Sequence, residues 1–214
     1  MARTEEPERV CPVKSRPVPH LVCDRFLGRP FAAQVCSFAV ANRSDFLPAV
    51  VTRHGVAREC DPGTRRCLTF EGSLGTLGAA FLDAVRQLDP MARLGVEAPA
   101  DPHLDLSLSA YDDGAFFAPH SDVVTGANRR FIGYDRLVTV TYYAHVPTAR
   151  IQGGALILHP MVPSAQPAAI APLNDRLVAF PSYAPHEVSR VSLKQASFAH
   201  ARFALTYWLG RRLA

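Results

Sequence analysis

The segment that most constrains the fold of this chain is residues 136–143, where two kinds of side chain alternate strictly. One set is Val138, Val140 and Tyr142, and the other is Thr139, Thr141 and Tyr143. A period of two places successive side chains on opposite faces of a β-strand. We therefore expect a strand with one face packed into a core, Tyr142 included, and the other face lining a pocket.

Three side chains of the metal-binding kind accompany this strand. His120 and Asp122 stand two residues apart, so both side chains point to the same side of a strand or its extension. His186 follows a second short apolar run, residues 175–182, and should lie at the end of another strand. Two imidazoles and a carboxylate form the facial triad of non-haem Fe(II) oxygenases, which leaves one face of the metal open for a co-substrate and dioxygen.

Arg202 extends this pattern. It directly precedes residues 203–209, a β-rich apolar segment that must be largely buried. A guanidinium suits a dicarboxylate co-substrate, because it binds a carboxylate through two hydrogen bonds. Each part also has an ordinary explanation: His120 as a loop cap, Asp122 as a turn residue and Arg202 as a solvated surface charge. The prediction of an oxygenase therefore depends on all of them together.

The ordered motifs resemble the prolyl-4-hydroxylase-like branch of the Fe(II)/2-oxoglutarate-dependent dioxygenases. The resemblance covers residues 106–209. Its motifs are Tyr111 to Phe117 leading into His120-Ser121-Asp122, residues 136–143, Gly153-Gly154-Ala155-Leu156, residues 175–182, His186-Glu187-Val188 and residues 202–208. The stretch 189–201 is longer than in many relatives, and Arg190 and Lys194 within it are the alternative anchors for a co-substrate.

The resemblance implies a mainly β fold with supporting α-helices, namely the double-stranded β-helix, a cupin-like jelly roll. It implies that His120, Asp122 and His186 bind Fe(II) at the open mouth of the barrel. It also implies that Arg202 pairs with the distal carboxylate of 2-oxoglutarate, with help from the Tyr143 hydroxyl, while Tyr111 lines the pocket. The reaction implied couples oxidative decarboxylation of 2-oxoglutarate by dioxygen to hydroxylation of an unactivated C–H bond.

The sequence is compatible with several classes of primary substrate. A small molecule, such as an amino acid or a biosynthetic intermediate, is favoured because no peptide-binding module is recognisable; a carrier-bound intermediate or a prolyl side chain in a protein is also compatible. Asp122 argues for hydroxylation, because related halogenases carry a small residue there. A different class of function is a non-catalytic, cupin-like metal-binding protein, which would not need Arg202.

Residues 123–134 join the His-x-Asp motif to the next strand and therefore pass the open face of the iron. We expect either a solvated loop or a lid over the substrate. In the second case Arg136 would face an anionic group of the substrate, with Arg130 and Tyr134 as further substrate-binding residues.

The remaining segments predict the layout of one domain, residues 21–214, after an extended arm of residues 1–20. Helical support is expected at about 26–95 and the barrel core at about 104–210. Helices are predicted at 30–43 and at 73–88, the latter capped by Ser73 and lying against the outer face of one sheet. The turn at 61–64 predicts a hairpin between 56–58 and 67–70, and residues 160–172 predict a surface loop.

Composition limits the class of protein. A chain of 214 residues with 48% hydrophobic residues can bury one substantial core. No apolar run is long enough to span a bilayer, and the charged first nine residues do not resemble a signal peptide, so we expect no membrane partner and a cytoplasmic protein. Five cysteines without a Cys-x-x-Cys pair indicate reduced thiols, and a net charge of +4 with scattered basic residues does not favour nucleic-acid binding.

Overall fold

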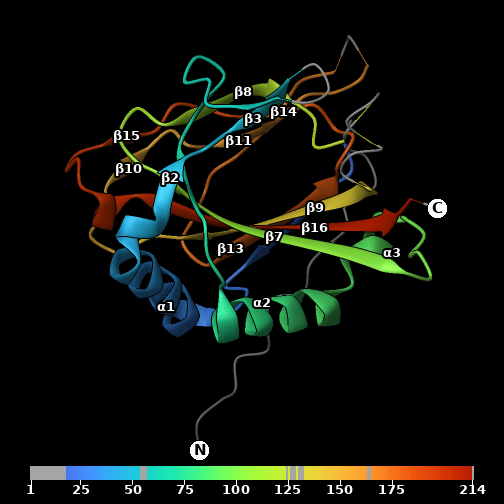
Figure 1. The fold of residues 1–214 in the computed structure, drawn as a ribbon, viewed down its shortest axis with the longest axis horizontal. Coiled ribbons are helices and arrows are strands. Elements are labelled where there is room, and N and C mark those ends of the chain that lie inside the picture. The colour runs from blue at the N-terminus through green and yellow to red at the C-terminus, as the bar shows by residue number, and fades with distance from the viewer. Residues whose placement is uncertain are drawn as a thin grey trace, which may run out of the picture.

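The computed structural model describes residues 18–53, 57–123, 125, 129, 133–162 and 165–213. Two antiparallel sheets face each other, and helices cover the outer side of the larger sheet (Figure 1). The helices are α1 (Gly28–Ala41), α2 (Gly75–Leu88) and α3 (Pro90–Leu94), with the 3-10 turns η1 (Arg43–Asp45) and η2 (Phe198–His200).

The larger sheet has seven strands in the order β1-β13-β9-β16-β7-β6-β2. Their bounds are β1 Leu21–Asp24, β13 Arg176–Pro181, β9 Tyr134–Ala144, β16 Arg202–Arg212, β7 Pro102–Tyr111, β6 Leu68–Phe70 and β2 Phe46–Pro48. The long strands β9, β16 and β7 lie side by side at its centre, so their inward side chains form the floor of the barrel.

The smaller sheet has five strands in the order β12-β11-β14-β8-β5. Their bounds are β12 Ala168–Ile170, β11 Leu156–Leu158, β14 His186–Val188, β8 Phe116–His120 and β5 Arg65–Arg66. Two short pairs lie outside these sheets: β3 (Val51–Arg53) with β4 (Ala57–Glu59), and β10 (Ile151–Gln152) with β15 (Ser192–Leu193). The arrangement is the predicted double-stranded β-helix.

The alternation in β9 separates core from cavity as predicted. Val138, Val140 and Tyr142 are fully buried in the cluster formed with α1 and α2. The Tyr142 ring packs edge-on against Phe31 and tilted against Phe81. The intervening residues of β9 face the space between the two sheets. The outer face of the larger sheet therefore carries the hydrophobic core, and its inner face is free for function.

Both predicted helices form against this core. The first begins at Gly28, two residues earlier than predicted, and the second begins at Gly75. Ser73 does not cap α2 in the predicted way: Leu74 occupies the N-cap, and the Ser73 hydroxyl accepts a hydrogen bond from the Gly75 amide at 3.2 Å. From α2, Leu77, Phe81 and Val85 are buried against the outer face of the larger sheet, as expected.

The predicted hairpin is wrong. The turn exists, since Asp61 accepts from the amides of Thr64 and Arg65, but the strands beside it do not pair with each other. Instead β4 pairs with β3, β5 with β8 and β6 with β2 and β7. For β6 the non-local partners bury more apolar surface: Phe70 is buried beside Phe46 of β2, whereas Glu59 of β4 is exposed.

Other boundaries also shift. Strands β1, β2, β5 and β6 show that residues before 95 supply sheet as well as helical support. The predicted loop at 160–172 contains the edge strand β12, whose Ile170 is buried. Residues 1–17 of the predicted arm lie outside the described residues. In the rest of the predicted arm, Val18 and His20 are buried.

The described cysteines, Cys23, Cys36, Cys60 and Cys67, are free thiols. Burial raises the pKa of the Cys23 and Cys36 thiols to about 11. Within the described ranges, no helix is both long and apolar enough to cross a membrane.

Candidate active site

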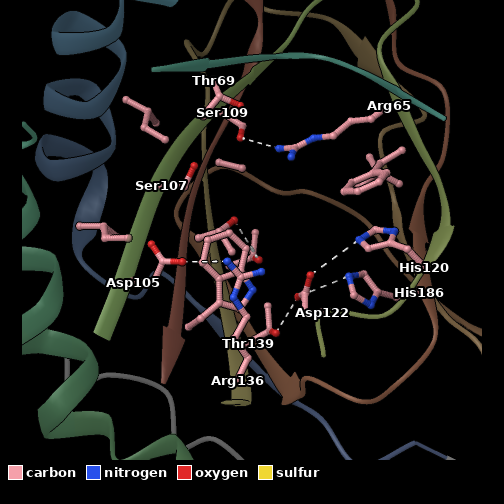
Figure 2. Close-up of a pocket in the computed structure, with 18 of the residues that line it drawn as sticks. Arg65, Thr69, Asp105, Ser107, Ser109, His120, Asp122, Arg136, Thr139 and His186 are labelled. Atoms are coloured by element: carbon pink, nitrogen blue, oxygen red, sulfur yellow. Dashed lines mark hydrogen bonds and ion pairs between the residues drawn. The ribbon is translucent and has the colours of Figure 1, made fainter. Parts of the chain in front are cut away.

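The three predicted metal ligands converge between the sheets (Figure 2). His120 is the last residue of β8 and His186 the first of β14, and the two residues are direct partners in the antiparallel pairing. Asp122 lies just beyond β8, where its amide donates to the Ser182 carbonyl at 2.9 Å. Strand pairing thus brings together side chains that are remote in sequence.

The ligand atoms are close enough to bind one ion. One donor atom from each of the three residues lies within 4.8 Å of the others. Nε2 of His120 is 3.8 Å from Asp122 Oδ1, and Nε2 of His186 is 3.7 Å from Asp122 Oδ2. Two neutral nitrogen donors and one carboxylate match the donor set of a non-haem ferrous site.

Hydrogen bonds on the far side of each ring determine the tautomer. Nδ1 of His120 lies 2.8 Å from the Ala118 carbonyl, and Nδ1 of His186 lies 2.9 Å from the Ala184 carbonyl. A carbonyl oxygen only accepts, so each Nδ1 carries the proton and donates it. Both Nε2 lone pairs therefore face Asp122 and are available to a cation.

The carboxylate is also held in place. Thr139 Oγ1 donates to Asp122 Oδ2 at 2.7 Å, and Ser182 Oγ lies 2.9 Å from Thr139 Oγ1. Burial opposes ionisation of Asp122, but the positive charges that His186, His120 and Arg136 can carry outweigh it and lower the pKa of Asp122 to about 2. Burial, with repulsion from His186, lowers the pKa of His120 to about 4. At neutral pH His120 is thus uncharged and Asp122 ionised, as metal binding requires.

The triad opens into a cavity of about 630 Å³ between the sheets, and Arg202 lines the same cavity. Arg202 is only 1% exposed, yet its Nε and Nη2 have no hydrogen-bond partner among the described residues. Its guanidinium lies 4.0 Å from the centre of the Tyr111 ring and 5.1 Å from that of Tyr143. A buried cation with free donors is costly unless an anion joins it, so the pocket fits a carboxylate.

The predicted partners of Arg202 lie where expected. Tyr111 and Tyr143 are buried beside the guanidinium and line the cavity. Burial raises the pKa of Tyr143, although the charge of Arg202 opposes the shift, so the hydroxyl keeps its proton and can donate. The alternative anchors lie elsewhere: Arg190 is exposed and donates to the Gly114 carbonyl at 2.7 Å, and Lys194 is exposed outside this cavity.

The predicted substrate residues are only partly described. Arg130 lies outside the described residues, as does most of the predicted lid at 123–134. Arg136 lines the cavity, but its Nη2 donates to Asp105 Oδ2 at 2.7 Å, and the Tyr134 hydroxyl donates to the same oxygen at 2.6 Å. The Arg136 guanidinium also lies 3.8 Å over the Trp208 ring. Its charge therefore already has a partner within the protein.

Other cavity residues were not identified from the sequence. Thr139 was expected on the pocket face, but its contact with Asp122 depends on the opposition of β9 and β8, which alternation cannot reveal. Arg65 of β5 lies outside the motifs, and no sequence signal placed it in the cavity. The inward residues of β7 could have been found, since Ser107, Ser109 and Tyr111 alternate with apolar Leu106, Leu108 and Ala110.

Comparison with known proteins agrees with this geometry. Residues 106–210 match the model of the 2OG-Fe(II) oxygenase superfamily. A PKHD-type hydroxylase of Synechocystis is 24% identical over 153 residues, which cover 67% of this chain and 49% of that protein. The chain therefore spans about half the length of the curated relative that it matches.

Two solved structures share the fold. A prolyl-4-hydroxylase of Pseudomonas putida superposes with a TM-score of 0.65 at 20% identity, covering 91% of this chain and 93% of that one. A prolyl hydroxylase of Trichoplax adhaerens, solved with a peptide fragment of a hypoxia-inducible factor, gives a TM-score of 0.65 at 21% identity, covering 89% and 82%. The predicted fold is confirmed, and residues 106–210 of the chain belong to the 2OG-Fe(II) oxygenase superfamily, whose enzymes use ferrous iron, 2-oxoglutarate and dioxygen.

Proposed function

We propose that this protein is a hydroxylase of small, polar molecules. His120, Asp122 and His186 bind the ferrous ion, and Arg202, with Tyr143 and Tyr111, binds 2-oxoglutarate. When bound, the iron supplies activation of dioxygen, driven by decarboxylation of 2-oxoglutarate. The observation that carries the proposal is the buried guanidinium of Arg202, whose Nε and Nη2 lack a partner among the described residues and which lines the same cavity as the triad.

Arg202 argues against a non-catalytic metal-binding barrel. Such a protein needs the triad but gains nothing from a second, uncompensated charge in its interior, which costs free energy of folding. A dicarboxylate co-substrate supplies the missing anion. The Tyr143 hydroxyl, protonated and buried on the same wall, is a second donor for that anion.

The cavity lining supports a small, polar substrate. The inward faces of β7, β9 and β16 carry hydroxyl side chains in neighbouring positions, namely Ser107, Ser109, Thr141 and Thr206. Ser109 is buried and the other three are half-buried, and their side-chain contacts are long: Thr141 Oγ1 lies 3.4 Å from Thr206 Oγ1, and Arg65 Nη2 lies 3.4 Å from Ser109 Oγ. Such hydroxyls on a cavity wall favour a ligand that offers hydrogen bonds. A peptidyl-proline substrate is the second candidate, since a structurally similar enzyme was solved with a peptide fragment.

The test is succinate formation by the whole protein with ferrous iron, 2-oxoglutarate and air, across free amino acids, other small metabolites and proline-containing peptides. We expect a slow rate without substrate and a faster rate with a small polar molecule. The His186→Ala variant is the control for free iron and should form no succinate above background. Absence of succinate under every condition would refute the proposal, and stimulation by peptides alone would favour the second candidate.

A further inference from the structure

A second arginine reaches the cavity from the opposite sheet. Arg65 belongs to β5 at the edge of the smaller sheet, and Figure 2 shows its side chain entering the cavity with the guanidinium directed toward Ser109 of the larger sheet. Its Nη2 donates to Ser109 Oγ at 3.4 Å, and its Nε donates to Cys67 Sγ at 3.2 Å. Both contacts are to neutral groups and both are weak, so neither balances the charge.

The three arginines of the cavity differ in what balances their charge. Arg136 is paired with Asp105 at 2.7 Å. Arg202 takes the distal carboxylate of 2-oxoglutarate in the function proposed above. Arg65 has no carboxylate within ion-pair distance in the described part of the chain, although it lies between the sheets. After the co-substrate is bound, Arg65 is the arginine among the described cavity residues that still lacks an anionic partner.

Arg65 is connected to the metal site through one aromatic ring. Its guanidinium lies 4.8 Å from the centre of the Phe117 ring. The same ring stacks on the imidazole of His120, with centroids 3.5 Å apart and planes 16° from parallel. One aromatic ring therefore separates Arg65 from His120, so a molecule that contacts Arg65 within the cavity lies on the side of the cavity that holds the triad.

We propose that Arg65 binds a carboxylate of the primary substrate, which makes the substrate class small polar carboxylic acids, free amino acids among them. This inference rests on the proposed function and deepens it. The carboxylate pairs with Arg65, the hydroxyls of β7 bind polar groups of the substrate body, and the remaining end reaches the iron. An internal residue of a peptide has its carboxyl group in an amide and cannot make this ion pair.

The first experiment uses the unaltered protein and needs no variant. Free amino acids and related small acids are compared pairwise with their carboxamides, and stimulation of succinate release is measured for each pair. We expect acids to stimulate release and their amides to do so at least about tenfold less effectively in kcat/KM, because one charge-assisted contact is lost. If amides match their acids, or if no free acid stimulates, the inference is wrong.

The second experiment tests whether Arg65 is the residue that distinguishes acids from their amides. For the best acid, Arg65→Gln should raise KM at least about tenfold and remove the preference for acid over amide, while KM for 2-oxoglutarate moves less than about twofold. Arg65→Lys, which keeps the charge, should retain part of the preference. The matched control is Arg66→Gln, because Arg66 neighbours Arg65 on β5 but is exposed and does not line the cavity; it should behave as the unaltered protein.

The outcomes separate this inference from the function on which it rests. If the unaltered protein forms no succinate at all, the proposed hydroxylase activity fails. If it forms succinate but Arg65→Gln raises KM for 2-oxoglutarate and leaves the acid preference intact, Arg65 belongs to the co-substrate and the inference fails alone. If Arg65→Gln does not fold, the inference is tested by the comparison of acids with amides in the unaltered protein and by the acid preference of Arg65→Lys.

Discussion

The Thr139 hydroxyl donates to Asp122 Oδ2 at 2.7 Å, and this contact joins the two sheets at the proposed metal site. Thr139 belongs to β9 of the larger sheet, whereas Asp122 follows β8 of the smaller one. The Ser182 hydroxyl, 2.9 Å from Thr139 Oγ1, must donate to it, because the threonine proton is already directed at the carboxylate. Two hydroxyls in series thus orient Asp122, the carboxylate of the proposed triad.

Thr139→Val should lower iron affinity without removing a ligand. Valine has nearly the shape of threonine but cannot donate to Asp122, so the carboxylate loses its orientation. Loss of such a supporting contact typically costs about 10- to 100-fold in metal affinity. Titration with Fe(II) under anaerobic conditions measures the change, and Thr139→Ser should restore most of it. Unchanged affinity in Thr139→Val would mean that Asp122 is held without this hydroxyl.

His186→Ala should abolish iron binding and turnover together. The substitution removes one of only three ligands, leaving two donors that hold the ion too weakly to retain it. Iron content by elemental analysis and succinate formation are the two measurements. His159→Ala is the matched control, because His159 lies outside the cavity with Nε2 3.2 Å from Glu187 Oε1. An active, iron-loaded His186→Ala protein would show that the triad is not the iron site.

Arg202→Ala should impair use of 2-oxoglutarate while sparing iron. Losing a charge-assisted contact in a desolvated pocket costs about 2 to 5 kcal/mol, so KM for 2-oxoglutarate should rise by about one and a half to three and a half orders of magnitude. Iron affinity should stay nearly unchanged, since Arg202 is not a ligand. The control is Arg190→Ala, which removes an exposed arginine of the neighbouring segment. A larger effect in Arg190→Ala would reassign the anchor.

The sequence predicts the fold correctly where a local residue pattern is compatible with a single kind of secondary structure. Alternation along residues 136–143 correctly separated the buried Val138, Val140 and Tyr142 from the cavity face, because a period of two admits only a strand. The convergence of His120, Asp122 and His186 was predictable because two histidines and an aspartate at strand ends form a known metal-binding donor set, and the structure brings their donor atoms within 4.8 Å of one another.

What could not be predicted depends on partners distant in the chain. The turn at 61–64 is real, yet its flanking strands pair elsewhere, because a turn signal is local and the choice of partner strand depends on which side chains can be buried. Arg65 illustrates the same limit for the site. Nothing near it in sequence indicates a cavity, and it lines one only because β5 pairs with β8, the strand that ends at His120.

Tyr142→Phe should destabilise the fold through its buried partner. The Tyr142 hydroxyl donates to Asp175 Oδ1 at 2.9 Å, and the Leu27 amide, just before α1, donates to the same oxygen at 2.9 Å. Asp175 is only 2% exposed, so losing one donor leaves a buried carboxylate poorly solvated and should cost about 1 to 3 kcal/mol of unfolding free energy. Denaturant unfolding measures it. Tyr207→Phe is the matched control, because the buried Tyr207 hydroxyl has no partner in the described structure, and its removal should not destabilise.

Gly154→Ala should disturb the 2-oxoglutarate pocket through Arg202. Gly154 has a φ of +66°, a left-handed conformation that costs a residue with a Cβ about 1 to 2 kcal/mol. A Cβ at this position would also lie 2.9 Å from Val191 Cγ2 and 3.3 Å from Arg202 Nε, so the guanidinium would have to move. Gly95→Ala separates the two effects, because Gly95 has a φ of +70° and nothing within 4 Å of the added Cβ. We expect both variants to lose unfolding free energy in denaturant titrations, Gly154→Ala more because its Cβ also meets Val191, while only Gly154→Ala raises KM for 2-oxoglutarate. Equal KM values in the two variants would show that Arg202 tolerates the displacement or does not bind the co-substrate.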